Sequence, residues 1–100
     1  MLKSYESKMD VMGEIDDANE LFLKKRFVDA IKKYEDVLQI EPDNLIALNN
    51  KGYTLSKLKK HSQALSCYDE SLRKNPKDKT VLINKISTFR KIGEFNNAVD

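Results

Sequence analysis

The sequence contains few of the residues that cross-link a chain or break regular secondary structure. It has a single cysteine, Cys67, so no disulfide can form within the chain, which fits a reducing compartment. Only three glycines and two prolines are present, which excludes collagen-like and Pro/Gly-rich disordered chains. With 40% hydrophobic and 34% charged residues, the composition is typical of a helix-rich protein with an ordinary core.

Long apolar runs and a charge excess of one sign are also lacking. No run approaches the ~20 apolar residues of a membrane span, and the start, MLKSYESKMDVMGEIDD, lacks a signal peptide's apolar core. The net charge is only +2, with both signs interspersed, so composition gives no indication of a membrane or nucleic-acid partner. We expect a cytoplasmic protein of one small domain, because 100 residues enclose no large catalytic cavity.

Catalytic and metal-binding patterns are missing as well. Gly13, Gly52 and Gly93 are isolated, so no glycine-rich phosphate loop exists. The only histidine, His61, lies six residues before Cys67, a spacing that does not put both on one helical face. Cys67 also lacks an adjacent base that would activate it. We therefore expect no enzyme, no cofactor and no metal site.

Three charged clusters have plain interpretations. EIDD at 14–17 is interpreted as a solvated charge cluster at the start of a repeat. KKR at 24–26 and KLKK at 57–60 fall at the ends of predicted helices, where cations complement the helix dipole. Both lack the interleaved aromatics that stack on bases. A nucleic-acid partner is not expected, although an RNA-binding helical repeat stays an alternative.

The sequence contains a pattern that repeats with a period of 34 residues. AIKKYEDVLQIEP at 30–42 returns as ALSCYDESLRKNP at 64–76. The shift aligns several small, apolar and aromatic positions at once, more than chance supplies: Ala30 with Ala64 and Ala98, Tyr34 with Tyr68, Leu38 with Leu72, Pro42 with Pro76, and Leu21 with Leu55 and Phe89.

Apolar residues within each unit recur at helical spacing. Pro42 and Pro76 end helices, because proline lacks the N–H group. The segments KKRF, LKKH and IGEF mark short turns between antiparallel helices. The first helix is expected to be extended at its start by an apolar stripe of Leu2, Tyr5, Met9 and Met12. Together these patterns predict helices near 4–24, 28–41, 45–58, 62–74, 79–92 and from 95 onward.

This 34-residue helix–turn–helix unit resembles the tetratricopeptide repeat, and the resemblance covers residues 11–100. It implies an all-α, right-handed α-solenoid of antiparallel helix pairs with about 2.6 repeats. Small residues such as Gly52 would let paired helices approach closely. Glu14, Asp17 and Ile86 depart from the family pattern. The expected division is an N-terminal helical extension at 1–10, repeats at 11–44 and 45–78, and a partial repeat at 79–100.

The resemblance implies that the first helix of each repeat lines a concave groove. A subfamily that grips C-terminal carboxylates uses cations where this chain has Ile15, Thr80 and Asn84, so such a grip is not expected. The resemblance instead implies a protein-interaction scaffold that binds a peptide or helix, with asparagines that contact an extended backbone. The groove residues that it implies are Met12, Ile15, Asn19, Phe22, Ile46, Asn49, Asn50, Tyr53, Lys57, Ile83, Asn84, Ser87, Arg90 and Lys91.

The third repeat leads to two further expectations. The sequence stops 22 residues into that repeat, so the chain is alternatively a fragment or helper module of a larger protein. Without a following helix its apolar side chains would be uncovered, which predicts a possible homodimer through Ile86, Phe89, Ile92, Phe95 and Val99.

Overall fold

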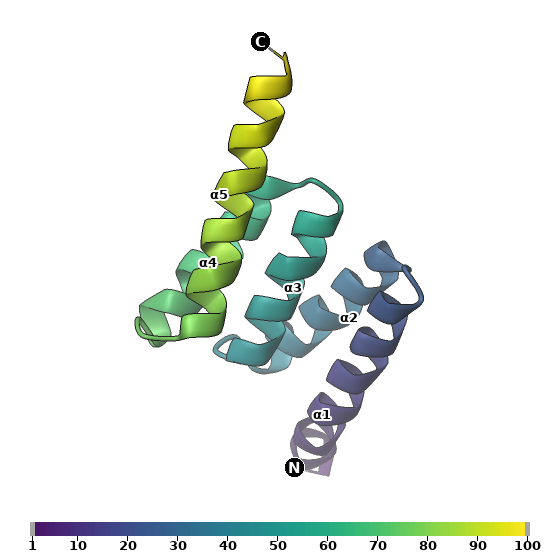
Figure 1. Cartoon of the computed structure of the whole chain (residues 1–100). Coiled ribbons are helices and arrows are strands. Elements are labelled where there is room, and N and C mark those ends of the chain that lie inside the picture. The colour runs from purple at the N-terminus through teal and green to yellow at the C-terminus, as the bar shows by residue number, and fades with distance from the viewer. Residues whose placement is uncertain (1, 100) are drawn as a thin grey trace.

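A computed structural model of the chain describes the backbone of residues 2–99 and the side chains of residues 10–94. This part of the chain is all-α and contains no strand. Its helices are α1 (Leu2–Leu23), α2 (Phe27–Ile40), α3 (Leu45–Lys57), α4 (His61–Lys74) and α5 (Lys79–Val99) (Figure 1).

The helices pack as successive antiparallel neighbours in a single row. α1 pairs with α2 and α3 pairs with α4, while α2 contacts α3 and α4 contacts α5. In Figure 1, α2 and α4 lie behind the layer that α1, α3 and α5 form. The molecule measures 56 × 30 × 17 Å, a flat and elongated body. The predicted all-α solenoid is confirmed.

The same helix cap returns with the 34-residue period. Asn44 precedes α3, and its Oδ1 accepts a hydrogen bond of 2.9 Å from the Ala47 amide. Asp78 precedes α5 and accepts from the Val81 amide at 3.2 Å. Each side chain satisfies an amide that has no partner within its own helix. These caps explain why the chain restarts a helix shortly after each proline.

Repeated ion pairs join each helix pair to the next. Lys51 Nζ on α3 lies 3.3 Å from Glu35 Oε2 on α2. Thirty-four residues later, Lys85 Nζ on α5 lies 2.6 Å from Asp69 Oδ1 on α4. Since both pairs are partly exposed, each contributes only modestly to stability. Their value is that they specify one register between consecutive repeats.

Two of the three predicted turns form, and the third does not. Lys25 and Lys59 turn the chain with φ of 62° and 63°, in the left-handed region. Gly93 stands at the equivalent position, yet α5 runs unbroken to Val99, so the predicted turn at IGEF and separate helix from 95 are wrong. A left-handed residue is stabilised by packing of the helix that follows. At Gly93 the helix instead continues, and each further residue of a helix adds about one backbone hydrogen bond.

Two hydrophobic clusters form the core, one for each complete helix pair. The first surrounds Tyr34 between α1 and α2, and the second surrounds Tyr68 between α3 and α4. Ile15 is only 7% exposed and belongs to the first cluster, so its predicted place in the groove is wrong. It lies one turn from Val11 and Ala18, both buried, and therefore shares their face of α1.

The remaining sequence expectations have mixed outcomes. Glu14, unusual at its family position, is accommodated by an ion pair of 3.3 Å to Lys33 on α2. Some expectations concern side chains outside the described residues, namely Leu2, Tyr5, Met9, Phe95, Ala98 and Val99.

Candidate functional site

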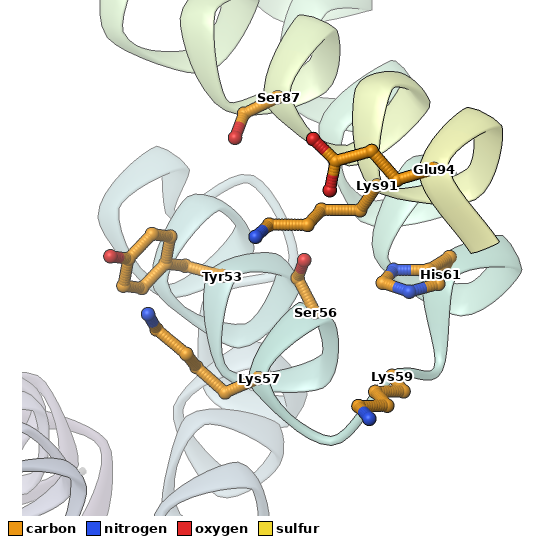
Figure 2. A pocket seen from close by; sticks show the side chains of 8 residues that line it. All are labelled: Tyr53, Ser56, Lys57, Lys59, His61, Ser87, Lys91 and Glu94. Atoms are coloured by element: carbon orange, nitrogen blue, oxygen red, sulfur yellow. The ribbon is translucent and has the colours of Figure 1, made fainter. Parts of the chain in front are cut away.

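Two hollows open along the α1, α3 and α5 layer. The larger, called here the basic hollow, has a volume of about 500 Å³ (Figure 2) and is lined by Tyr53, Ser56, Lys57, Lys59, His61, Ser87, Lys91 and Glu94. The smaller, called here the apolar hollow, has a volume of about 280 Å³ and is lined by Asn19, Phe22, Leu23, Tyr34, Asn50, Tyr53 and Thr54. Tyr53 belongs to both hollows and separates them.

Stacked aromatic rings build the wall between the hollows. The rings of Phe22 on α1 and Tyr53 on α3 have centroids 5.5 Å apart and are tilted by 39°. Phe27, at the start of α2, supports Phe22 from behind with a centroid distance of 5.3 Å. Tyr53 remains 40% exposed and presents ring surface to solvent. A tyrosine held this way offers apolar area and a hydroxyl with little rotamer freedom to lose.

Asparagines link neighbouring first helices across the layer. Asn50 on α3 donates a hydrogen bond of 3.2 Å to Asn19 Oδ1 on α1, and the Tyr34 hydroxyl donates to the same oxygen. Asn84 on α5 donates to Asn49 Oδ1 on α3 at 3.0 Å. These bonds position α1, α3 and α5 relative to one another. All four amides are only half-buried, and the prediction that they contact a peptide backbone stays a prediction.

The basic hollow collects cations from three segments. Lys57 ends α3, and its Nζ lies 5.1 Å from the Tyr53 ring centroid, within cation–π range. Lys59 occupies the left-handed turn between α3 and α4. Lys91 reaches from α5 across the hollow toward Ser56, with the Glu94 carboxylate beside it (Figure 2). Three lysines against one glutamate leave the hollow with a positive charge.

The predicted groove residues divide into several groups. Those that line the basic hollow are Tyr53, Lys57, Ser87 and Lys91. Those that line the apolar hollow are Asn19, Phe22, Asn50 and Tyr53. Exposed residues that line neither hollow are Met12, Ile46, Ile83 and Arg90. The half-buried Asn49 and Asn84 pair with each other, and Ile15 lies in the core.

Ser56 stands at a groove position that the resemblance implies for the first helix of repeat two, but three other residues of the basic hollow were not predicted: Lys59, His61 and Glu94. Lys59 and His61 lie on the turn and on the second helix of repeat two, whereas the prediction considered first helices only. The KLKK cluster at 57–60 was the available signal, but it was interpreted as solvated charge. The structure places two of its lysines, Lys57 and Lys59, in the basic hollow, and Lys57 lies over the exposed Tyr53 ring.

The remaining reactive groups include the single cysteine and the acidic side chains of the described part of the chain. Cys67 is buried in the second core cluster, and burial raises the pKa of its thiol, which keeps it in the weakly nucleophilic neutral form. Among the residues with described side chains, no group of three His, Cys, Asp or Glu side chains is placed to hold a metal ion. No described helix has the length and apolarity that crossing a bilayer requires.

Paired helices, a recurring 34-residue register of caps and ion pairs, and a hollowed face built by alternate helices define an α-helical repeat protein. Residues 46–78, which span most of α3 and all of α4, match the family model of the tetratricopeptide repeat. This segment is a tetratricopeptide repeat, and the chain as a whole has the tetratricopeptide-repeat fold.

Solved structures with this fold superimpose on almost the whole chain. The second TPR of Spaghetti (RPAP3), bound to the HSP90 peptide SRMEEVD, has a TM-score of 0.82 at 15% identity, covering 98% of this chain and 90% of that one. The TPR2AB-domain:pHSP90 complex of yeast Sti1 has a TM-score of 0.81 at 20% identity, covering 97% and 40%. The TPR2B-domain:pHsp70 complex of yeast Sti1 has a TM-score of 0.73 at 20% identity, covering 98% and 73%.

Proposed function

We propose that the protein is a non-catalytic interaction module that binds a peptide across the two hollows, with Tyr53 between the bound side chains. The observation that carries this proposal is the exposed Tyr53 ring, which forms a wall of both an apolar and a basic hollow. Proteins of the same fold bind peptides of HSP90 and Hsp70, which supports a peptide as the partner class.

The chemistry of the hollows restricts the peptide. Phe22 and Leu23 favour an apolar side chain in the apolar hollow. Lys57 and Lys91 favour a negatively charged group in the basic hollow, on the other side of Tyr53. A peptide that presents an apolar residue near an anionic one would satisfy both. This arrangement differs from a C-terminal carboxylate grip, whose cations are replaced here by Ile15, Thr80 and Asn84.

Tyr53→Ala is expected to weaken peptide binding by at least tenfold, because truncating a central aromatic anchor commonly costs about 2 kcal/mol. Peptides would first be selected from a random displayed library against the wild-type chain, and their affinities then measured by calorimetry. The helical circular dichroism should stay unchanged, since Tyr53 lies outside both core clusters. Ile46→Ala is the matched control, being an exposed α3 residue that lines neither hollow. Equal affinity of Tyr53→Ala and Ile46→Ala would contradict the proposal.

We further propose that two copies associate through the outer face of α5. Ile86 and Phe89 are 58% and 54% exposed, although their equivalents on α1 and α3 are covered by α2 and α4. Leu82, one turn earlier, extends this apolar face. Ile86 stands where Ala18 and Gly52 make close helix contacts, so α5 is better suited to a wider pairing with another large-residue face.

The Ile86→Glu, Phe89→Glu double variant is expected to be monomeric, because it places two charges in the proposed contact. Light scattering over a concentration series would measure the mass of both chains. A Gln63→Glu, Ser66→Glu double variant, with the same charge added to the exposed face of α4, should keep the wild-type mass. A monomer mass for the wild-type chain at high micromolar concentration would refute the association.

Three finer expectations remain proposals. They are the division into an extension at 1–10, repeats at 11–44 and 45–78 and a partial repeat at 79–100, the cytoplasmic location, and the alternative that the chain is one module of a larger protein.

A further inference from the structure

We infer that the basic hollow is a binding site for a phosphorylated side chain, a phosphoserine or phosphothreonine carried by a peptide. The inference rests on the proposed peptide-binding function and names the chemistry of one half of the site. It depends on the charge, the donors and the position of the side chains that line the hollow.

The charge of the hollow is not balanced by neighbouring carboxylates. Lys57, Lys59 and Lys91 form no ion pair within the described residues, whereas the lysines that join consecutive repeats are paired with carboxylates. The three lysines and Glu94 together carry a formal charge of +2. A phosphate monoester carries about −1.5 to −2 at neutral pH and neutralises this charge, whereas a single carboxylate neutralises only half of it.

Another hollow of the same molecule provides an internal comparison. It is also lined by lysines and an arginine, but Asp29 and Asp36 lie among them. Arg26 is bound to Asp29 at 2.7 Å, and Lys33 is bound to Glu14 at 3.3 Å. These two cations are thus already satisfied, so this hollow offers an anion little. Among the described residues, only Lys32 of its three cations forms no ion pair, whereas all three lysines of the basic hollow form none.

The donors of the basic hollow also suit a phosphate. It offers three ammonium groups, and a phosphate ester presents three terminal oxygens as acceptors, whereas a carboxylate presents only two. The Ser87 hydroxyl faces the same space from α5 (Figure 2). The Ser56 hydroxyl also lines the hollow but is hydrogen-bonded to Thr88 Oγ1 at 3.4 Å.

The position of Lys91 cannot be explained by helix electrostatics. Lys57 and Lys59 lie at the C-terminal end of α3, where cations complement the helix dipole whatever their function. Lys91 lies well inside α5, which continues to Val99, and has no such role. It nevertheless extends over the hollow toward the two α3 residues Ser56 and Tyr53 (Figure 2). A ligand that bridges the two repeats accounts for this convergence.

Nitrogen-labelled full chain would be titrated with free O-phosphoserine, and separately with glutamate and serine, at constant ionic strength and pH. We expect saturable shifts for the amides of Tyr53, Lys57, His61 and Lys91 with O-phosphoserine, and at least about threefold weaker binding of glutamate. Lys91→Gln should weaken O-phosphoserine binding by about three- to tenfold, as expected for losing one partly exposed charge-assisted contact. Lys57→Gln should act in the same direction.

Arg90→Gln is the matched control, because it removes the same charge from the next residue of α5, which lines neither hollow. It should change the affinity less than about twofold, as screening predicts for a charge outside the site. An equal loss of O-phosphoserine affinity in Arg90→Gln and Lys91→Gln would overturn the inference, because it would show that the anion is attracted by the overall positive charge of α5 rather than bound in the hollow. Glutamate binding as tightly as O-phosphoserine would overturn it in favour of a carboxylate site.

The two proposals fail in different ways. In one outcome, library peptides bind the wild-type chain but not Tyr53→Ala, and phosphorylation of their serines does not raise the affinity. This outcome would support the peptide groove and overturn the phosphate site. Saturable, Lys91-dependent binding of O-phosphoserine without any Tyr53-dependent peptide would support the phosphate site and overturn the peptide groove.

Discussion

Gly52→Leu is expected to lower the free energy of unfolding by about 3 kcal/mol, at the upper end of the usual cost of overpacking a core. A Cβ atom at position 52 would lie 2.7 Å from Tyr68 Cε1 and 3.2 Å from Cys67 Cβ. Neither neighbour can retreat, because both are buried between α3 and α4. Gly52 has ordinary helical φ, so the penalty is steric rather than conformational.

Urea denaturation followed by circular dichroism would measure this change. Gly13→Leu is a matched control, because a Cβ at position 13 of α1 meets nothing within 4 Å. Leucine is a better helix former than glycine, so this control should be neutral or stabilise the chain by up to about 1 kcal/mol. Similar losses at positions 13 and 52 would show that the close approach of α3 and α4 is not what requires glycine.

Tyr68→Ala is expected to destabilise the chain by about 3–5 kcal/mol, the range found when a large buried side chain leaves a cavity. The Tyr68 ring is 0% exposed and belongs to the second core cluster, at the α3–α4 interface. The unfolding free energy of a domain of this size is about 5–15 kcal/mol, so the variant would be marginally stable. Thermal unfolding should therefore begin many degrees below that of the wild-type chain.

Tyr68→Phe separates the ring from the hydroxyl. It should cost less than about 1 kcal/mol at neutral pH, because the buried hydroxyl has no hydrogen-bond partner among the described residues. Burial raises the pKa of Tyr68 to about 12, above the ordinary value of 10.0, so folding favours the neutral phenol. The contribution of the neutral phenol to the free energy of unfolding is complete below pH 10 and is lost as the pH rises toward 12. The Tyr68→Phe chain should therefore lose less stability than the wild-type chain over that pH interval. Equal losses in the two chains would contradict a raised pKa of Tyr68 in the folded state.

The 34-residue period by itself determined the two complete helix pairs and their order, although not the third pair. It could do so because each matched position acts locally or over a short range. A proline ends a helix, Asn44 and Asp78 start one, and the pair Ala30 and Tyr34 returns 34 residues later on one buried stripe. Such effects depend on the chain's own periodicity and caps. The two tyrosine-centred cores therefore lie where the pattern predicts.

Only the tertiary structure decided which faces and contacts those helices finally have. The family resemblance placed Ile15 in the groove, whereas packing against α2 buries it in the first core cluster. Gly93 stands where Lys25 and Lys59 turn the chain, but α5 continues through it to Val99. The basic hollow joins α3, the α3–α4 turn and α5, about 40 residues from end to end. Convergence over such separations depends on how the repeats stack, which no local pattern in the sequence records.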